Sequence, residues 1–137
     1  MRRWGAAVSA LMVVGVLAGC SSGSTSSTPA QVVELSAENM AFSTKEITVK
    51  KGTPVKLVLT NKDTLLHDFT VEKMPAKVKE SKGDDHGHDA GLSVHVAADT
   101  GKTGTVEFTP TEAGSYTFTC TVPGHKDAGM VGKLIVQ

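Results

Sequence analysis

Three residues whose side chains bind soft metals lie near the C-terminus at intervals of five: Cys120, His125 and Met130. The Val-Pro-Gly sequence before the histidine predicts a tight loop that returns it towards the cysteine. A thiolate and imidazoles can hold both Cu(I) and Cu(II), and a weak axial thioether tunes the reduction potential. The spacing therefore predicts a copper site. Taken singly, Cys120 and Met130 could instead be buried core residues.

A site of this kind needs a second imidazole, and the phase of the strands indicates which histidine supplies it. His67 is in phase with Phe69 and Val71, on the face expected to point into the core. His95 is out of phase with its apolar neighbours, so we expect it on an exposed strand face. His67 is therefore the predicted second imidazole ligand. A core histidine with an ordinary hydrogen-bond partner would show the same phase.

The elements that must position these residues are β-strands. Apolar and polar residues alternate from residue 32 onwards, as in Val55–Leu59 and in a final strand over Val131–Val136. Turn sequences rich in Gly, Pro, Asn and Asp separate these segments, and no segment shows sustained helical spacing. The pattern predicts an all-β sandwich in one domain, residues 32–137.

Residues 73–92 interrupt the alternation with many charged residues and glycines, which predicts a solvated insertion with one helical turn near Pro75–Lys79. Within it, His86 and His88 alternate with carboxylates and could form a weak second metal site for Cu(II) or Zn(II). The alternative is a solvated polar loop, which we favour because nothing in the sequence fixes its geometry.

The N-terminal segment has the features of a secretory signal. Arg2 and Arg3 precede an uncharged apolar run, which predicts a signal peptide over residues 1–19. Its end, Leu-Ala-Gly-Cys, resembles the lipobox of bacterial lipoproteins, which implies lipidation of Cys20 and a flexible tether over residues 20–31. An ordinary signal peptide or a short membrane anchor is the alternative. We expect a lipid-anchored protein of the bacterial cell envelope, facing the periplasm or the outside.

The composition excludes several other functions. Lys and Arg total 14 and Asp and Glu total 14, so no basic excess points to a nucleic-acid partner. Five histidines are too few for a multi-copper oxidase core, and no second catalytic copper site is present, so we expect no enzymatic activity. With Cys20 acylated, Cys120 has no partner for an intramolecular disulfide. We expect a monomer.

Several segments together resemble the cupredoxins, the small blue copper proteins, and the resemblance covers nearly all of residues 34–137. The segments are Glu38–Phe42, Ile47–Val55, His67–Phe69 and the Cys-x4-His-x4-Met sequence of residues 120–130. The family implies a Greek-key β-sandwich with one type 1 copper. It also implies equatorial ligation by His67, Cys120 and His125, with Met130 as the axial ligand.

The resemblance also implies a function, one-electron transfer to a redox partner protein in the cell envelope. Small and apolar residues around His125 suit a weakly attractive docking surface for that partner. The alternative is a carrier or storage lipoprotein that delivers copper to another envelope protein. One position departs from the family, in which Asn commonly follows the first histidine and Asp68 stands here. A carboxylate accepts hydrogen bonds but donates none, so we expect different tuning of the copper.

Overall fold

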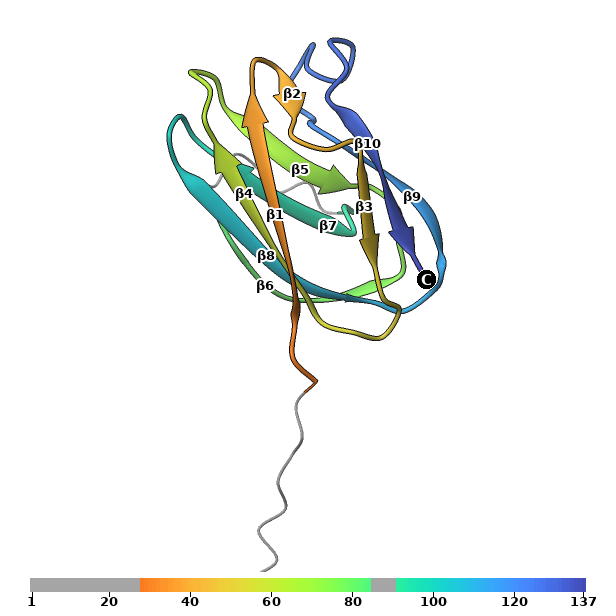
Figure 1. Cartoon of the computed structure of the whole chain (residues 1–137). Helices are drawn as coiled ribbons and strands as arrows, with labels where there is room; N and C mark the ends of the chain where they lie inside the picture. Colours follow the sequence, from red (N-terminus) through yellow and green to blue (C-terminus); the bar gives the residue numbers. More distant parts are fainter. Residues whose placement is uncertain (1–27, 85–90) are drawn as a thin grey trace, which may run out of the picture.

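Residues 28–84 and 91–137 are described in the computed structural model, and they fold into two facing β-sheets (Figure 1). The first sheet contains, in spatial order, β2 (Ala41–Phe42), β1 (Gln31–Glu38), β4 (Val55–Asn61), β8 (Thr103–Pro110) and β6 (Ala76–Lys82). The second contains β3 (Glu46–Val49), β10 (Val131–Val136), β9 (Gly114–Thr119), β5 (His67–Val71) and β7 (Val94–Ala98). The predicted all-β sandwich is confirmed. The described residues contain no helix, and so none that could cross a membrane.

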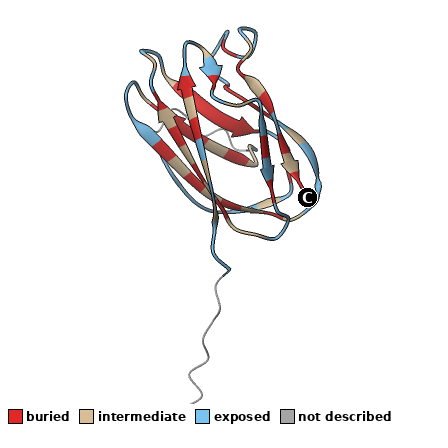
Figure 2. Cartoon of the chain, viewed as in Figure 1, coloured by how far each residue is buried: buried red, intermediate tan, exposed pale blue. Residues whose placement is uncertain are grey.

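Alternation along the strands builds the core between the two sheets. In β4 every second residue is buried, and β8 and β10 follow the same rule over most of their length (Figure 2). A chain of aromatic rings fills the middle, because Phe118 lies 5.4 Å from Phe42 and 5.1 Å from Phe69, centroid to centroid. Gly132 on β10 leaves room for it, since a Cβ there would collide with the Phe118 ring.

The topology brings three connections to one end of the sandwich. The turn between β1 and β2, the loop between β4 and β5, and the segment between β9 and β10 all lie there (Figure 1). β1 starts and β10 finishes at the opposite end. β5 is the central element for the site, because it pairs antiparallel with β7 and meets β9 where Thr70 lies opposite Thr119.

Two predictions about local structure are wrong. The segment expected to hold a helical turn forms β6, an edge strand. It pairs with β8, with a register shift between Val78 and Glu80. The sequence of β6 shows no alternation of apolar and polar residues because nearly all of its side chains are exposed. Its lysines are typical of edge strands, where they discourage pairing with strands of other molecules. His95 does face away from the core, but it is half-buried, with its Nδ1 atom 2.7 Å from the Thr70 hydroxyl.

Candidate metal centre

Three side chains from distant parts of the sequence converge at the end of the sandwich that carries the three connections. His67 begins β5, Cys120 directly follows β9, and His125 lies on the segment between β9 and β10; all three are buried. The Cys120 sulfur lies 3.9 Å from Nδ1 of His67 and 3.4 Å from Nδ1 of His125. The two Nδ1 atoms are 3.1 Å apart. The structure therefore brings the three predicted equatorial ligands together.

The three atoms have the spacing of a metal coordination triangle. The point equidistant from them lies about 2.0 Å from each, close to usual metal bond lengths of about 2.0–2.1 Å to nitrogen and about 2.3 Å to sulfur. Two imidazoles and one thiolate form the equatorial set of blue copper sites, whereas oxygen donors would favour harder ions. The residues present therefore fit a copper ion.

Main-chain hydrogen bonds hold the segment of residues 120–130. The amide of Cys120 donates to the Met130 carbonyl at 3.1 Å, and the amide of Met130 donates to the His125 carbonyl at 3.0 Å. Gly129 has φ of 104°, a conformation that side chains disfavour. A Cβ at this position would meet nothing nearer than Lys45 Nζ at 3.9 Å. Backbone conformation, and not crowding, requires the glycine.

Met130 is fully buried and belongs to the hydrophobic core cluster. Its main-chain contacts to Cys120 and His125 place it beside both residues. Its role as the axial ligand stays a prediction.

Asp68 ties the strand that carries His67 to the segment that carries Cys120. Its carboxylate accepts the Thr121 amide at 2.9 and 3.1 Å and the Thr121 hydroxyl at 2.8 Å. The Thr70 hydroxyl donates to it at 2.8 Å, and its own amide donates to the Cys120 sulfur at 3.5 Å. Asp68 thus connects the two ligand-bearing segments through its carboxylate, at the position where the family commonly has Asn.

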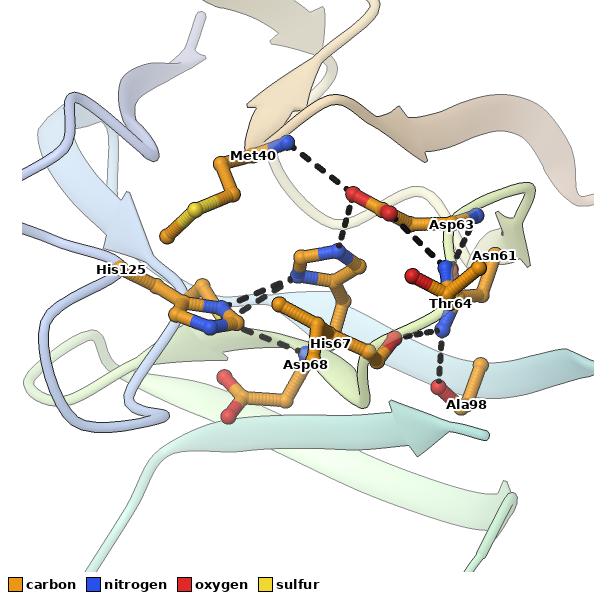
Figure 3. Close-up of polar contacts among 10 residues, drawn as sticks. Met40, Asn61, Asp63, Thr64, His67, Asp68, Ala98 and His125 are labelled. Atoms are coloured by element: carbon orange, nitrogen blue, oxygen red, sulfur yellow. Dashed lines mark hydrogen bonds and ion pairs between the residues drawn. The ribbon is translucent and has the colours of Figure 1, made fainter. Parts of the chain in front are cut away.

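Asp63, on the loop between β4 and β5, contacts His67. Its Oδ2 atom lies 3.2 Å from Nε2 of His67 (Figure 3), whereas Nδ1 of the same ring faces the Cys120 sulfur. An ionised carboxylate only accepts hydrogen bonds, so Nε2 of His67 is the donor in this contact, and in a neutral imidazole Nδ1 then keeps its lone pair. A buried ligand histidine needs a partner for its second nitrogen, and that requirement is the signal that could have pointed to Asp63.

The electrostatics of the site follow from burial and from these hydrogen bonds. Burial raises the pKa of the Cys120 thiol to about 11, against the lowering effect of the Asp68 amide. Burial, and then the neighbouring His67, lower the pKa of His125. The amides of Met40 and Thr64, followed by His67, lower the pKa of Asp63 to about 2. The imidazole of His125 is therefore disposed to be neutral, as a metal ligand must be, and a metal must displace the thiol proton.

Cys20, His86 and His88 lie outside the described residues, so the lipidation site and the weak second metal site stay predictions. Two further methionines contribute to packing, because Met40 lies against the hydrophobic core cluster and Met74 lies within it.

Fold and site together define a copper-binding β-sandwich. The family model for the Cupredoxin-like domain matches residues 9–136, and the chain belongs to this family. It is also similar to two bacterial proteins named copper-resistant cuproprotein CopI. The one from Rubrivivax gelatinosus is 36% identical over 104 residues, which span 73% of this chain and 62% of that relative's length. The one from Pseudomonas aeruginosa is 30% identical over 93% of this chain and 94% of its own.

Solved structures agree on the fold. Auracyanin B superposes with a TM-score of 0.63 at 24% identity, covering 80% of this chain and 91% of that one. Auracyanin A of Chloroflexus aurantiacus, described as a "blue" copper protein, gives a TM-score of 0.61 at 23% identity and covers 80% and 100%. With the His-Cys-His cluster, the family membership establishes that the chain binds copper, one ion at this site.

Proposed function

We propose that this protein carries single electrons, with copper held equatorially by His67, Cys120 and His125 and axially by Met130. The observation that carries the proposal is the mutual spacing of 3.1–3.9 Å among three buried ligand atoms fixed by two sheet strands and one hydrogen-bonded segment. Copper bound there supplies a one-electron couple. A donor set held in nearly one arrangement suits both oxidation states, so electron transfer needs little rearrangement.

Each part of the chain has a role in this proposal. The fully buried His67 and Cys120 keep water away from the donors. Asp68 links the two ligand-bearing segments and so resists changes in their separation. His125, which is 5% exposed, offers the route by which electrons reach the surface.

The surface around His125 suits brief docking of a redox partner. Pro123 and Ala128 are exposed beside it, and Leu65, 47% exposed, lies on the β4–β5 loop at the same end of the sandwich (Figure 1). β1 begins at the opposite end, so a flexible, lipidated N-terminal tether would leave this surface free to face away from the membrane. We propose that a monomer, anchored in the bacterial envelope, meets its partner in this orientation, without enzymatic activity and without nucleic acid.

The second candidate function is copper handling. Both CopI relatives are named as copper-resistant cuproproteins, which favours a protein that binds copper to hold it or to pass it to another envelope protein. The same four residues would serve either function, so the two candidates differ in rates and not in ligands.

Comparing two rates tests the proposal. Electron self-exchange is measured from NMR line broadening in mixtures of oxidised and reduced protein, and copper loss from transfer of Cu(I) to a chelator. An electron carrier exchanges electrons many times before it loses one copper ion. Loss of Cu(I) to the chelator faster than electron exchange would contradict electron transfer and support delivery.

A further inference from the structure

A carboxylate contacts the ring nitrogen of His67 that points away from the metal centre. Nε2 of His67 lies 3.2 Å from Oδ2 of Asp63, four residues earlier in the chain. His67 is fully buried, and the Asp63 side chain is 16% exposed. The contact is therefore shielded from competing water on the imidazole side, and Nδ1 of the same ring faces the Cys120 sulfur.

Asp63 is itself fixed in place by hydrogen bonds to three further residues (Figure 3). Its carboxylate accepts the amides of Met40 at 3.1 Å and Thr64 at 2.8 Å, and its own amide donates to the Asn61 side chain at 2.8 Å. Asn61, almost fully buried, donates in turn to the Ala98 carbonyl on β7 at 2.8 Å. The carboxylate cannot turn away from His67 without breaking hydrogen bonds to the β1–β2 turn and to its own loop.

The β1–β2 turn contributes an unusual conformation. Asn39 and Met40 both have positive φ, 52° and 56°, as a two-residue hairpin turn requires. A residue with the side chain of methionine adopts this conformation at a cost. In this conformation the Met40 amide points at Asp63, so the turn supports the carboxylate that supports His67.

We propose that Asp63 is a positioning residue that keeps the His67 proton on Nε2, directs Nδ1 towards Cys120, and strengthens the imidazole as a donor to Cu(II). A carboxylate bonded to the second nitrogen of a metal-binding histidine fixes its tautomer and raises its basicity. Its negative charge stabilises Cu(II) more than Cu(I), and so lowers the reduction potential. The inference rests on the proposed function only in taking His67 as a copper ligand.

A purely structural role makes different predictions. A turn residue needs only the contacts to the Met40 and Thr64 amides, which Asp63 accepts on different carboxylate oxygens. An asparagine whose single oxygen replaces Oδ2 would keep the contacts to Met40 and His67 and lose only the one to Thr64. Asp63→Asn retains an oxygen acceptor but loses the charge, whereas Asp63→Ala loses both. Asp127→Asn is the matched control, because Asp127 is exposed in the segment of residues 120–130 and its substitution removes the same charge.

The first measurement is the His67 tautomer in the copper-free protein, read from long-range proton–nitrogen NMR spectra. We expect Nε2 to be protonated in the original protein and in Asp63→Asn, and a mixture of tautomers in Asp63→Ala. This readout does not depend on bound copper. An Nδ1-protonated His67 in the original protein would overturn the inference, even if Asp63→Ala failed to fold.

The second measurement is affinity, from competition with chelators of Cu(II) and of Cu(I). Substituting partners of metal-binding histidines commonly costs about 10–100-fold in affinity. We expect a loss of that size for Cu(II) in both Asp63 variants and a smaller loss for Cu(I). The reduction potential then rises by about 59 mV for each tenfold difference between the two losses. Asp127→Asn should change neither affinity by as much as tenfold.

The outcomes separate this inference from the proposed function. Equal losses for Cu(II) and Cu(I), with an unchanged potential, would show that Asp63 only supports the turn. If His67→Ala kept the original copper affinity and colour, the ligand assignment would be wrong, while the tautomer experiment would still report whether Asp63 orients the ring.

Discussion

His67 and the segment of residues 120–130 reach the same point by different means. His67 is fixed through side chains: a sheet strand carries it, and a carboxylate supported by Asn61 and the Met40 amide holds its second nitrogen. The segment is fixed mainly by its own main chain, through amides that donate to the Met130, His125 and Val122 carbonyls. Within the described part of the chain, no side chain bonds to Nε2 of His125. We refer to these as the strand side and the loop side.

The difference shows which part of a metal site can be predicted from residues that are close together in the sequence. The loop side depends on spacing and on a glycine with positive φ, both of which are local. The strand side depends on contacts between elements, which only the folded chain creates. Asp68, bonded to Thr121 and Thr70, is the carboxylate that joins the two sides within residues 28–84 and 91–137.

The largest effect is expected on the loop side, from Cys120→Ser. Loss of the thiolate should abolish the intense blue absorption of the copper-loaded protein, because sulfur-to-copper charge transfer produces it. Visible absorption spectra of copper-loaded samples check this. Cys20→Ser is the matched control and should stay blue. A blue Cys120→Ser protein would remove Cys120 from the ligand set.

The next effect concerns the buried thiol in the copper-free protein. Its pKa is raised from 9.0 to about 11, so the unfolded chain loses the proton at lower pH than the native protein does. Below pH 9 the thiol should not affect stability. As the pH rises from 9 to 11, the unfolding free energy should fall by about 2 kcal/mol, and the total decline should approach about 3 kcal/mol at still higher pH. Denaturant unfolding at several pH values measures this, and Cys120→Ala should lack that part of the decline. Parallel curves for both proteins would contradict the raised pKa.

A somewhat smaller effect is expected where the two sides are joined. Asp68→Ala leaves the Thr121 amide without its acceptor and removes the link between the two sides, and should lower the unfolding free energy by about 1–3 kcal/mol. Asp68→Asn keeps an oxygen acceptor and should lose less. Chemical denaturation of both variants tests the comparison, and equal losses would mean that the negative charge matters more than the hydrogen bond.

The smallest effect is expected from Met130→Leu. Leucine fills nearly the same buried volume, so the fold and the copper should be retained, with affinity changed by less than tenfold, about 1.4 kcal/mol. Because a thioether on the axis donates weakly to copper, its removal should raise the reduction potential. Protein-film voltammetry reports the potential, and an unchanged value would exclude Met130 from the axial position.

Much of the fold could be predicted from the sequence because the central strands are buried on one face. Alternation located β4 through Val55, Leu57 and Leu59, and it gave the limits of β10. β6 could not be predicted, because an exposed edge strand has no buried face and its lysines are equally typical of a loop. His95 is less exposed than predicted because it lies beside β5, whose outer face is also buried. A side chain that points away from the core is therefore not always in contact with solvent.

The candidate site divides in the same way. Cys120 and His125 could be paired by spacing, and strand phase was enough to add His67. Asp63 could not be assigned, because an aspartate in a turn needs no further explanation and its contact with His67 depends on how the β4–β5 loop turns back. Contacts that depend on three-dimensional loop geometry are the part that a pattern of residue types leaves out.

The central claim is that one copper ion lies between His67, Cys120 and His125, and spectroscopy of the protein loaded with one equivalent of Cu(II) tests it most directly. Absorption and electron paramagnetic resonance spectra should show an intense visible band from the thiolate together with the narrow copper hyperfine splitting of a type 1 site. A faintly coloured sample with the resonance of tetragonal copper bound by nitrogen and oxygen alone would contradict the account.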